Sequence, residues 1–239
     1  MIALITRTIL RELGKNISYK KLLLIYINRI PAKYLPGGIW QTFARVYDLN
    51  AMGVGKMELG VLIFYENFWS VFIATVLSAT GIILLDNNSL YVNLALLALA
   101  GCVIVVLAGV FFRNQNFILS LEGYIKLSFA YLFFWLCTGV SFLLYFSSLG
   151  IKTEEYNSIL LISHYLFSYV VGFITFFAPQ GMGVFEVVMA ELAKFEIPLI
   201  QAVVLIAGFR LVVLISDVIS WTVFFLVQKS RFRITEIQE

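Results

Sequence analysis

The sequence predicts an all-α, polytopic membrane protein with inverted repeats and two re-entrant helix pairs, each broken at a Pro-Gly motif. Hydrophobic residues make up 61% of the 239 positions and charged residues only 13%, and the mean hydropathy is +0.94. This balance lies far from that of a soluble domain. The motifs Pro36-Gly37-Gly38 and Pro179-Gln180-Gly181-Met182-Gly183 interrupt the apolar pattern.

Each motif is expected to end a helix, because proline lacks the backbone N–H donor and glycine adopts backbone angles closed to other residues. Backbone left unpaired at membrane depth is tolerated only inside protein or beside a watery cavity. Broken helices in corresponding halves of a membrane protein point to a binding site. We therefore predict half-helices over residues 18–35 and 36–50, and a second pair over residues 159–177 and 181–195.

The remaining apolar runs predict membrane spans over residues 59–85, 89–112, 124–149 and 199–227, with a turn at residues 86–88. Within residues 1–33 the only sustained apolar run, 22–27, is too short to span alone. We expect one membrane domain over residues 1–227, with repeat one at about 18–112 and repeat two at about 122–227. Residues 228–239 are expected to form a basic cytoplasmic tail.

Basic residues set the predicted orientation. If both motif regions enter and leave on one side, 14 of the 17 Lys and Arg residues lie on the same side as the C-terminus. The positive-inside rule makes that side cytoplasmic. We expect a multi-pass protein of the cytoplasmic (inner) membrane. The first motif then enters from the cytoplasm and the second from outside, as in an inverted repeat.

Glu66, Arg210 and Asp217 fall inside predicted spans, where one charge costs on the order of 3 kcal/mol. They could pair with one another, and Glu66 with Arg210 is the pair we expect. Arg210 and Asp217 lie on similar helix faces but are separated by about 10 Å of rise. Alternatively, these charges line a cavity that meets a lipid head group or a coupled ion. Guanidinium matches phosphate geometry, which favours the second interpretation for Arg210, whereas both stay open for Asp217.

The half-helices that start near Pro36 and Pro179 would present unpaired N–H groups and positive dipole ends, which suit an anion. Gly37, Gly38, Gly181 and Gly183 would let a phosphate approach the backbone, or would permit tight helix packing, and the two interpretations are compatible. Lys33 and Arg45 could add fixed positive charge. Arg45 shares one predicted helix face with Gln41 and Asp48, because these residues are spaced by four and three.

No signature of catalysis or of a cofactor occurs in the sequence. His164 is the single histidine and has no second ligand at metal-binding spacing, so we expect packing or one hydrogen bond for it. Cys102 and Cys137 lie in apolar runs and are expected to be buried thiols. We therefore expect no enzyme, no cofactor, no metal and no nucleic-acid partner.

The residues around both motifs carry a family resemblance. The run from Lys33 to Trp40, followed by Arg45, Gly53 and Glu66, resembles the first signature of the lysylphosphatidylglycerol synthase transmembrane-region family. The second signature is similar to Pro179, Gly181, Gly183, Val184, Phe185, Glu186 and Arg210, with Gln180 where the family often has glycine. The resemblance covers roughly residues 10–227.

Members of this family are the flippase-like membrane halves of multiple peptide resistance factor proteins and their free-standing relatives. The resemblance implies an inverted-repeat helical fold with re-entrant segments and, for some members, movement of a charged lipid between leaflets. It does not extend to the aminoacyl-transferase domain of the longer members, so the synthase reaction is not expected.

The leading functional hypothesis is therefore a lipid translocase for an anionic phospholipid or a phosphate-bearing glycolipid. Basic residues would attract the head group, and Glu66, Glu186 or Asp217 would pair with arginine or select a cationic moiety. The alternative is a membrane scaffold or accessory subunit of an envelope lipid or polysaccharide pathway, with a second copy or an envelope-biosynthesis protein as partner. The predicted lipid-binding residues are Lys33, Pro36, Gly37, Gly38, Arg45, Glu66, Pro179, Gly181, Gly183, Glu186, Arg210 and Asp217.

Overall fold

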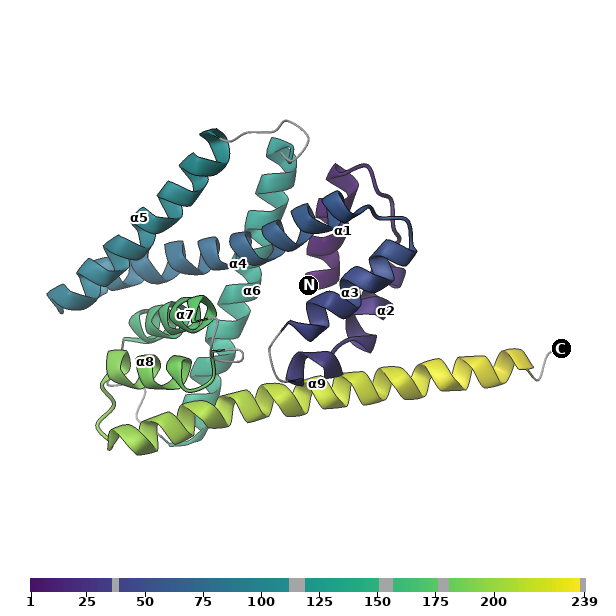
Figure 1. The fold of residues 1–239 in the computed structure, drawn as a ribbon. Helices are drawn as coiled ribbons and strands as arrows, with labels where there is room; N and C mark the ends of the chain where they lie inside the picture. The colour runs from purple at the N-terminus through teal and green to yellow at the C-terminus, as the bar shows by residue number, and fades with distance from the viewer. Residues whose placement is uncertain (36–38, 112–118, 151–156, 176–180, 237–239) are drawn as a thin grey trace.

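The computed structural model describes residues 1–35, 39–111, 119–150, 157–175 and 181–236. Within these ranges the chain is helical, with short connections and no strand. Figure 1 shows α4 across the middle of the molecule and α9 along its lower edge, with α7 and α8 between them at the left and α1 to α3 at the right. The predicted all-α class is confirmed for the described residues.

Four helices are long and apolar enough to cross a membrane, over Lys56–Leu85, Ser89–Leu107, Leu121–Ser148 and Leu199–Val227. They belong to α4 (Lys56–Leu85), α5 (Ser89–Phe111), α6 (Leu121–Ser148) and α9 (Leu199–Glu236). The structure therefore contains a long apolar helix at each of the four predicted spans. The backbone of α9 continues as a helix beyond Val227, so the predicted tail begins as an extension of the last span.

The N-terminal region contains a helix that was not predicted, α1 (Ile2–Glu12). It buries Ile5, Ile9 and Leu10, each at most 1% exposed. The spacing of four between Ile5 and Ile9 places them on one face, while Arg11 and Glu12 stay exposed. A short helix therefore packs against the spans in a region that carries seven basic residues before position 34.

The first predicted half-helix, residues 18–35, is shorter than expected. Helix α2 spans Tyr19–Asn28, and Ser18 caps it by accepting a hydrogen bond from the N–H of Lys21. A separate 3-10 turn, η1, follows over Pro31–Tyr34. Pro31 explains the early end, since proline has no backbone N–H and cannot donate the next helical hydrogen bond. The second half-helix is α3 (Trp40–Ala51).

Helices α7 (Ser158–Ile174) and α8 (Val184–Ala193) form the second predicted pair. Helix α7 lies close to its neighbours because small residues face it. A Cβ built on Gly81 of α4 would meet the hydroxyl of Ser163, and one on Gly139 of α6 would lie 2.7 Å from the Cγ2 atom of Ile162. An aromatic cluster then joins α6, α7 and α9 through Phe142, Tyr165 and Phe209. This packing places α8 beside α9.

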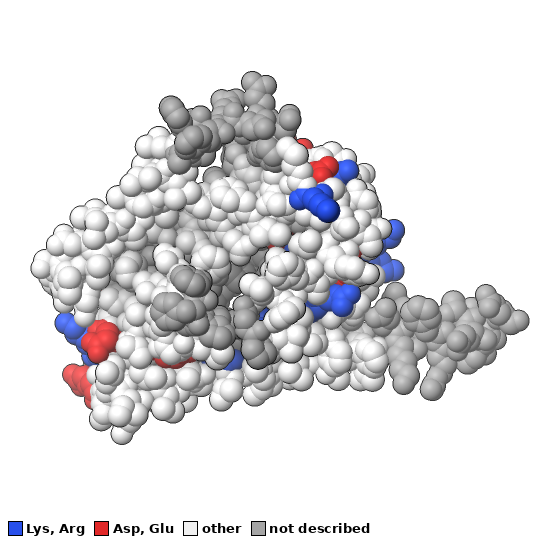
Figure 2. All heavy atoms as spheres, in the orientation of Figure 1, with Lys and Arg blue, Asp and Glu red and all other residues white. Residues whose placement is uncertain are grey.

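The surface is mostly apolar between two charged margins. Figure 2 shows a face on which blue and red atoms gather at the lower left and at the right, with white atoms between them and a hollow near the centre. Large exposed hydrophobic residues on α5, α6 and α9 account for the apolar surface; examples are Leu97, Ile104, Phe129, Leu144, Leu211 and Ile219. Such a band suits contact with lipid acyl chains.

Candidate functional site

Three ion pairs of the described residues involve the elements that flank the two predicted breaks. Two of them join consecutive helices, and the third joins η1 to the last helix. They are Arg45 with Glu66, Lys33 with Asp217, and Arg210 with Glu186. All six residues were predicted as lipid-binding residues. The structure therefore brings the predicted charges together in pairs, although not in the combination expected from the sequence.

Arg45 on α3 pairs with Glu66 in the middle of α4. The Nη2 atom of Arg45 lies 2.8 Å from Oε1 and 2.6 Å from Oε2 of Glu66. Thr6 of α1 donates a hydrogen bond of 2.5 Å to the same Oε1 atom. The two charged side chains are only 12% and 10% exposed. This pair is consequently enclosed by three helices, with Tyr131 of α6 donating to the backbone oxygen of Glu66 as a fourth support.

The second pair joins the first break to the last span. Lys33 of η1 lies 3.0 Å from Oδ2 of Asp217, and the hydroxyl of Tyr34 donates a 2.7 Å hydrogen bond to the same atom. Burial, and then the hydrogen bond to Asp217, raise the pKa of the Tyr34 hydroxyl above its usual value. Tyr34 therefore stays a neutral donor across the physiological pH range.

The third pair lies at the second break. The Nε atom of Arg210 lies 2.9 Å from Oε1 of Glu186, and the other carboxylate oxygen accepts a 2.7 Å hydrogen bond from the N–H of Gly183. The guanidinium also stands 4.7 Å from the centre of the Phe185 ring, which is a cation–π distance. Glu186 thus caps α8 itself. The anion expected at this helix N-terminus is a carboxylate of the protein.

Helix α9 connects the two breaks. Arg210 reaches the start of α8, and Asp217, two turns further along, reaches η1. Their separation of about 10 Å along the helix is the reason they do not pair with each other. The expected pair between Glu66 and Arg210 is wrong, because Glu66 is engaged by α3 and Arg210 by α8.

Glycines of the second motif have a clear structural role. Gly181 and Gly183 have φ angles of +67° and +85°, which favour glycine. A Cβ on Gly181 would lie 2.7 Å from the backbone oxygen of Gly172 in α7. Tight packing, one of the two interpretations given to these glycines, therefore applies to Gly181. Pro36, Gly37, Gly38 and Pro179 lie outside the described residues.

Several contributors to the site were not identified from the sequence. Thr6 and Tyr34 are the clearest, and neither carries a charge that would single it out in an apolar chain. Arg29 forms a two-pronged pair with Asp48, at 2.7 Å from Nε and 2.6 Å from Nη2, and these hydrogen bonds raise the pKa of Arg29. On the predicted polar face of α3, Arg45 therefore pairs with Glu66 of α4, and Asp48 pairs with Arg29, which follows α2.

His164 of α7 forms a 2.9 Å contact with Asp86 at the end of α4. This single polar contact agrees with the minor role expected for it. Among the described residues, no group of three or more His, Cys, Asp or Glu side chains is arranged to hold a metal ion.

No family model matches the chain, and neither a curated protein nor a solved structure does. The geometry of the ion pairs is consequently the basis for a functional assignment.

Proposed function

We propose that this protein moves a phosphate-bearing lipid, either an anionic phospholipid or a glycolipid, between the leaflets of the cytoplasmic membrane. The observation that carries the proposal is the set of ion pairs Arg45–Glu66, Lys33–Asp217 and Arg210–Glu186, each of which joins a short helix or turn to a helix long enough to span. Charged residues at membrane depth are costly and commonly mark a substrate pathway. The family resemblance around both Pro-Gly motifs points to the same activity.

Exchange of partners is the proposed mechanism. In the structure each cation is neutralised by a carboxylate, which avoids an unpaired charge at low dielectric. A phosphate that enters the site would replace the carboxylate on the guanidinium, since both anions match its planar fork. Arg210 is the more exposed of the two arginines, with 29% of its side chain exposed against 12% for Arg45. The first contact with the phosphate is therefore assigned to Arg210.

The arrangement of the pairs supports an inverted repeat. In each half a short helix after the break carries one charge, and the following long helix carries its partner: Arg45 on α3 with Glu66 on α4, and Glu186 on α8 with Arg210 on α9. The order of elements is the same, and the signs are exchanged. Rocking of one half against the other would expose the head-group site to each leaflet in turn.

A translocation assay tests the proposal. The protein is reconstituted into vesicles containing a fluorescent phosphatidylglycerol, and a membrane-impermeant reductant reports which leaflet holds the probe. Arg210→Ala should abolish movement while the folded protein remains in the membrane, because the phosphate loses its partner at the second break. Lys126→Ala is the matched control, since Lys126 forms an exposed pair with Glu122 one turn away. Movement retained in Arg210→Ala would refute the scheme.

One observation favours a scaffold as the second candidate function. One face of α5 packs against α4 through Ala95 and its neighbours, but only 6% of its apolar window is buried within the chain, so its other face is exposed to lipid or to another protein. Under that hypothesis Arg210→Ala would change retention of a co-purifying protein, a second copy or an envelope-biosynthesis protein, and would leave lipid distribution unchanged. Quantitative mass spectrometry of gently released wild type and variant distinguishes the two outcomes.

A further inference from the structure

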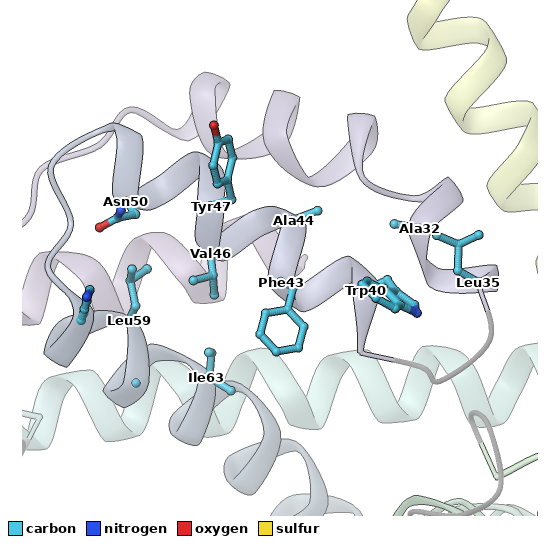
Figure 3. Close-up of a pocket in the computed structure, with 12 residues that line it drawn as sticks. Ala32, Leu35, Trp40, Phe43, Ala44, Val46, Tyr47, Asn50, Leu59 and Ile63 are labelled. Carbon is cyan, nitrogen blue, oxygen red and sulfur yellow. The ribbon is translucent and has the colours of Figure 1, made fainter.

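An apolar groove runs along the outer side of α3, away from the ion pairs. It has a volume of about 750 Å³ and is formed by η1, α3 and the first turns of α4. Figure 3 shows Phe43 and Val46 of α3 pointing toward Leu59 and Ile63 of α4, with Leu35 and Trp40 at one end and Asn50 at the other. The groove therefore lies between α3 and the first turns of α4.

The two ends of this groove differ in polarity. Asn50 lies near the end of α3 and Lys56 begins α4, and the short connection between the helices brings both to the same end. Among the described residues, Glu58 in the same turn is paired with Lys15 at 3.4 Å. Lys56 thus supplies the net positive charge at this end. The described residues that line the opposite end, Ala32, Leu35 and Trp40, are largely apolar.

The length of the groove fits one leaflet. From Trp40 to Asn50, α3 advances roughly 15 Å, which is half of a hydrocarbon core of about 30 Å. The walls are aromatic and aliphatic, and Phe43 and Tyr47 are strongly exposed, at 59% and 75%. An apolar slot of this length with Lys56 at one end matches an acyl chain attached to an anionic head group.

We propose that this groove binds one acyl chain of an anionic phospholipid, with the head group at Lys56 and Asn50 and the chain extending toward Trp40. The site is distinct from the proposed translocation path. Groove residues Phe43 and Tyr47 occupy the face of α3 opposite Gln41 and Arg45. Binding there would hold α3, and with it Arg45, against α4.

Photo-crosslinking tests the chain site. The full chain is reconstituted into phosphatidylcholine vesicles containing a minor fraction of phosphatidylglycerol with a diazirine on one acyl chain. After irradiation, peptide mapping by mass spectrometry should find the adducts concentrated within residues 40–63. Equal labelling of α5, which is exposed to lipid over nearly its whole length, would show bulk contact only and would overturn the proposal.

A groove-filling variant provides the matched comparison. Gly60 lines the groove, and a Cβ built on it meets nothing within 4 Å; the same is true of Gly101 on α5. Gly60→Phe should lower the yield of groove adducts severalfold without disturbing the fold, whereas Gly101→Phe should leave it unchanged. Undiminished labelling in Gly60→Phe, or a chain-to-chain crosslink through the groove in place of lipid adducts, would refute acyl-chain binding.

The head-group end is tested with a second probe, phosphatidylcholine carrying the same diazirine. One lysine near a membrane surface corresponds to about a fivefold preference for the anionic lipid. Lys56→Gln should abolish that preference, and Lys126→Gln, which removes a basic residue from α6, should retain it. A preference that survives Lys56→Gln would contradict the assignment of the head group to this end.

Discussion

The two halves of the molecule use the same ion pair in different surroundings. In the first, Arg45 and Glu66 are 12% and 10% exposed, and Thr6 adds a hydrogen bond from a third helix. In the second, Glu186 is 5% exposed while Arg210 is 29% exposed, and the additional donor is the backbone N–H of Gly183. The first pair is therefore enclosed on both sides, and the second has its carboxylate fixed and its cation accessible. This difference suggests a division between a structural pair and an exchangeable one.

Removal of the cation from the enclosed pair should have the largest effect on stability. Arg45→Ala leaves Glu66 buried with Thr6 as its remaining side-chain donor, and loss of one member of a buried pair costs about 3–5 kcal/mol. The free energy of unfolding in mixed micelles is the measurement. Arg210→Ala is the matched variant, and we expect it to lose roughly 1–2 kcal/mol, because Glu186 keeps the N–H of Gly183. Equal losses in the two variants would remove the proposed difference between the pairs.

An intermediate effect is expected at the second break itself. Gly181→Ala introduces a Cβ 2.7 Å from the Gly172 oxygen at a φ of +67°, and we expect a loss of roughly 2–3 kcal/mol from strain and overpacking. Gly183→Ala serves as control, since its φ is also positive but a Cβ there meets nothing within 4 Å. Thermal unfolding should show a clearly larger shift for Gly181→Ala, and similar shifts would mean that the contact with α7 contributes little.

The smallest effect is expected from loss of the hydrogen bond that Thr6 donates to Glu66 in the first pair. Thr6→Val removes the hydroxyl that donates to Glu66 and keeps the size of the side chain, so the loss should be about 1 kcal/mol. In the double variant Arg45→Ala with Thr6→Val, the two losses should not add, because both residues contact the same carboxylate. A double-variant cycle of unfolding free energies measures this coupling, and strict additivity would indicate that Thr6 acts independently of the pair.

The spanning helices could be predicted because hydropathy depends on local composition alone. The four predicted spans agree with α4, α5, α6 and α9 within a few residues. Helix α1 was missed because Thr6, Arg7 and Thr8 interrupt its apolar residues, so a search for long apolar runs passes over it. Its helical spacing, Ile5 and Ile9 on one face, was the signal that could have found it.

The pairing of charges could not be predicted in the same way. Helical periodicity shows that Arg210 and Asp217 share a face, but it does not reveal which neighbour that face meets. Glu66 pairs with Arg45, only 21 positions away, because the short connection after α3 folds this helix back along α4. Asp48 likewise turns to Arg29 rather than to a residue of another half. These pairings depend on which helices pack against each other, and hydropathy and helical periodicity do not show that.

The placement of Arg210 and Asp217 on one continuous helix has a mechanical consequence. Because α9 is rigid between them, a rotation about its own axis that lengthens the contact with Glu186 also moves the contact with Lys33. The ion pairs at the two breaks would then move together. A ligand that opens the ion pair at one break would change the affinity of the other break for its own ligand. Thermodynamic linkage makes that influence equal in both directions, so α9 would couple ligand binding at the two breaks.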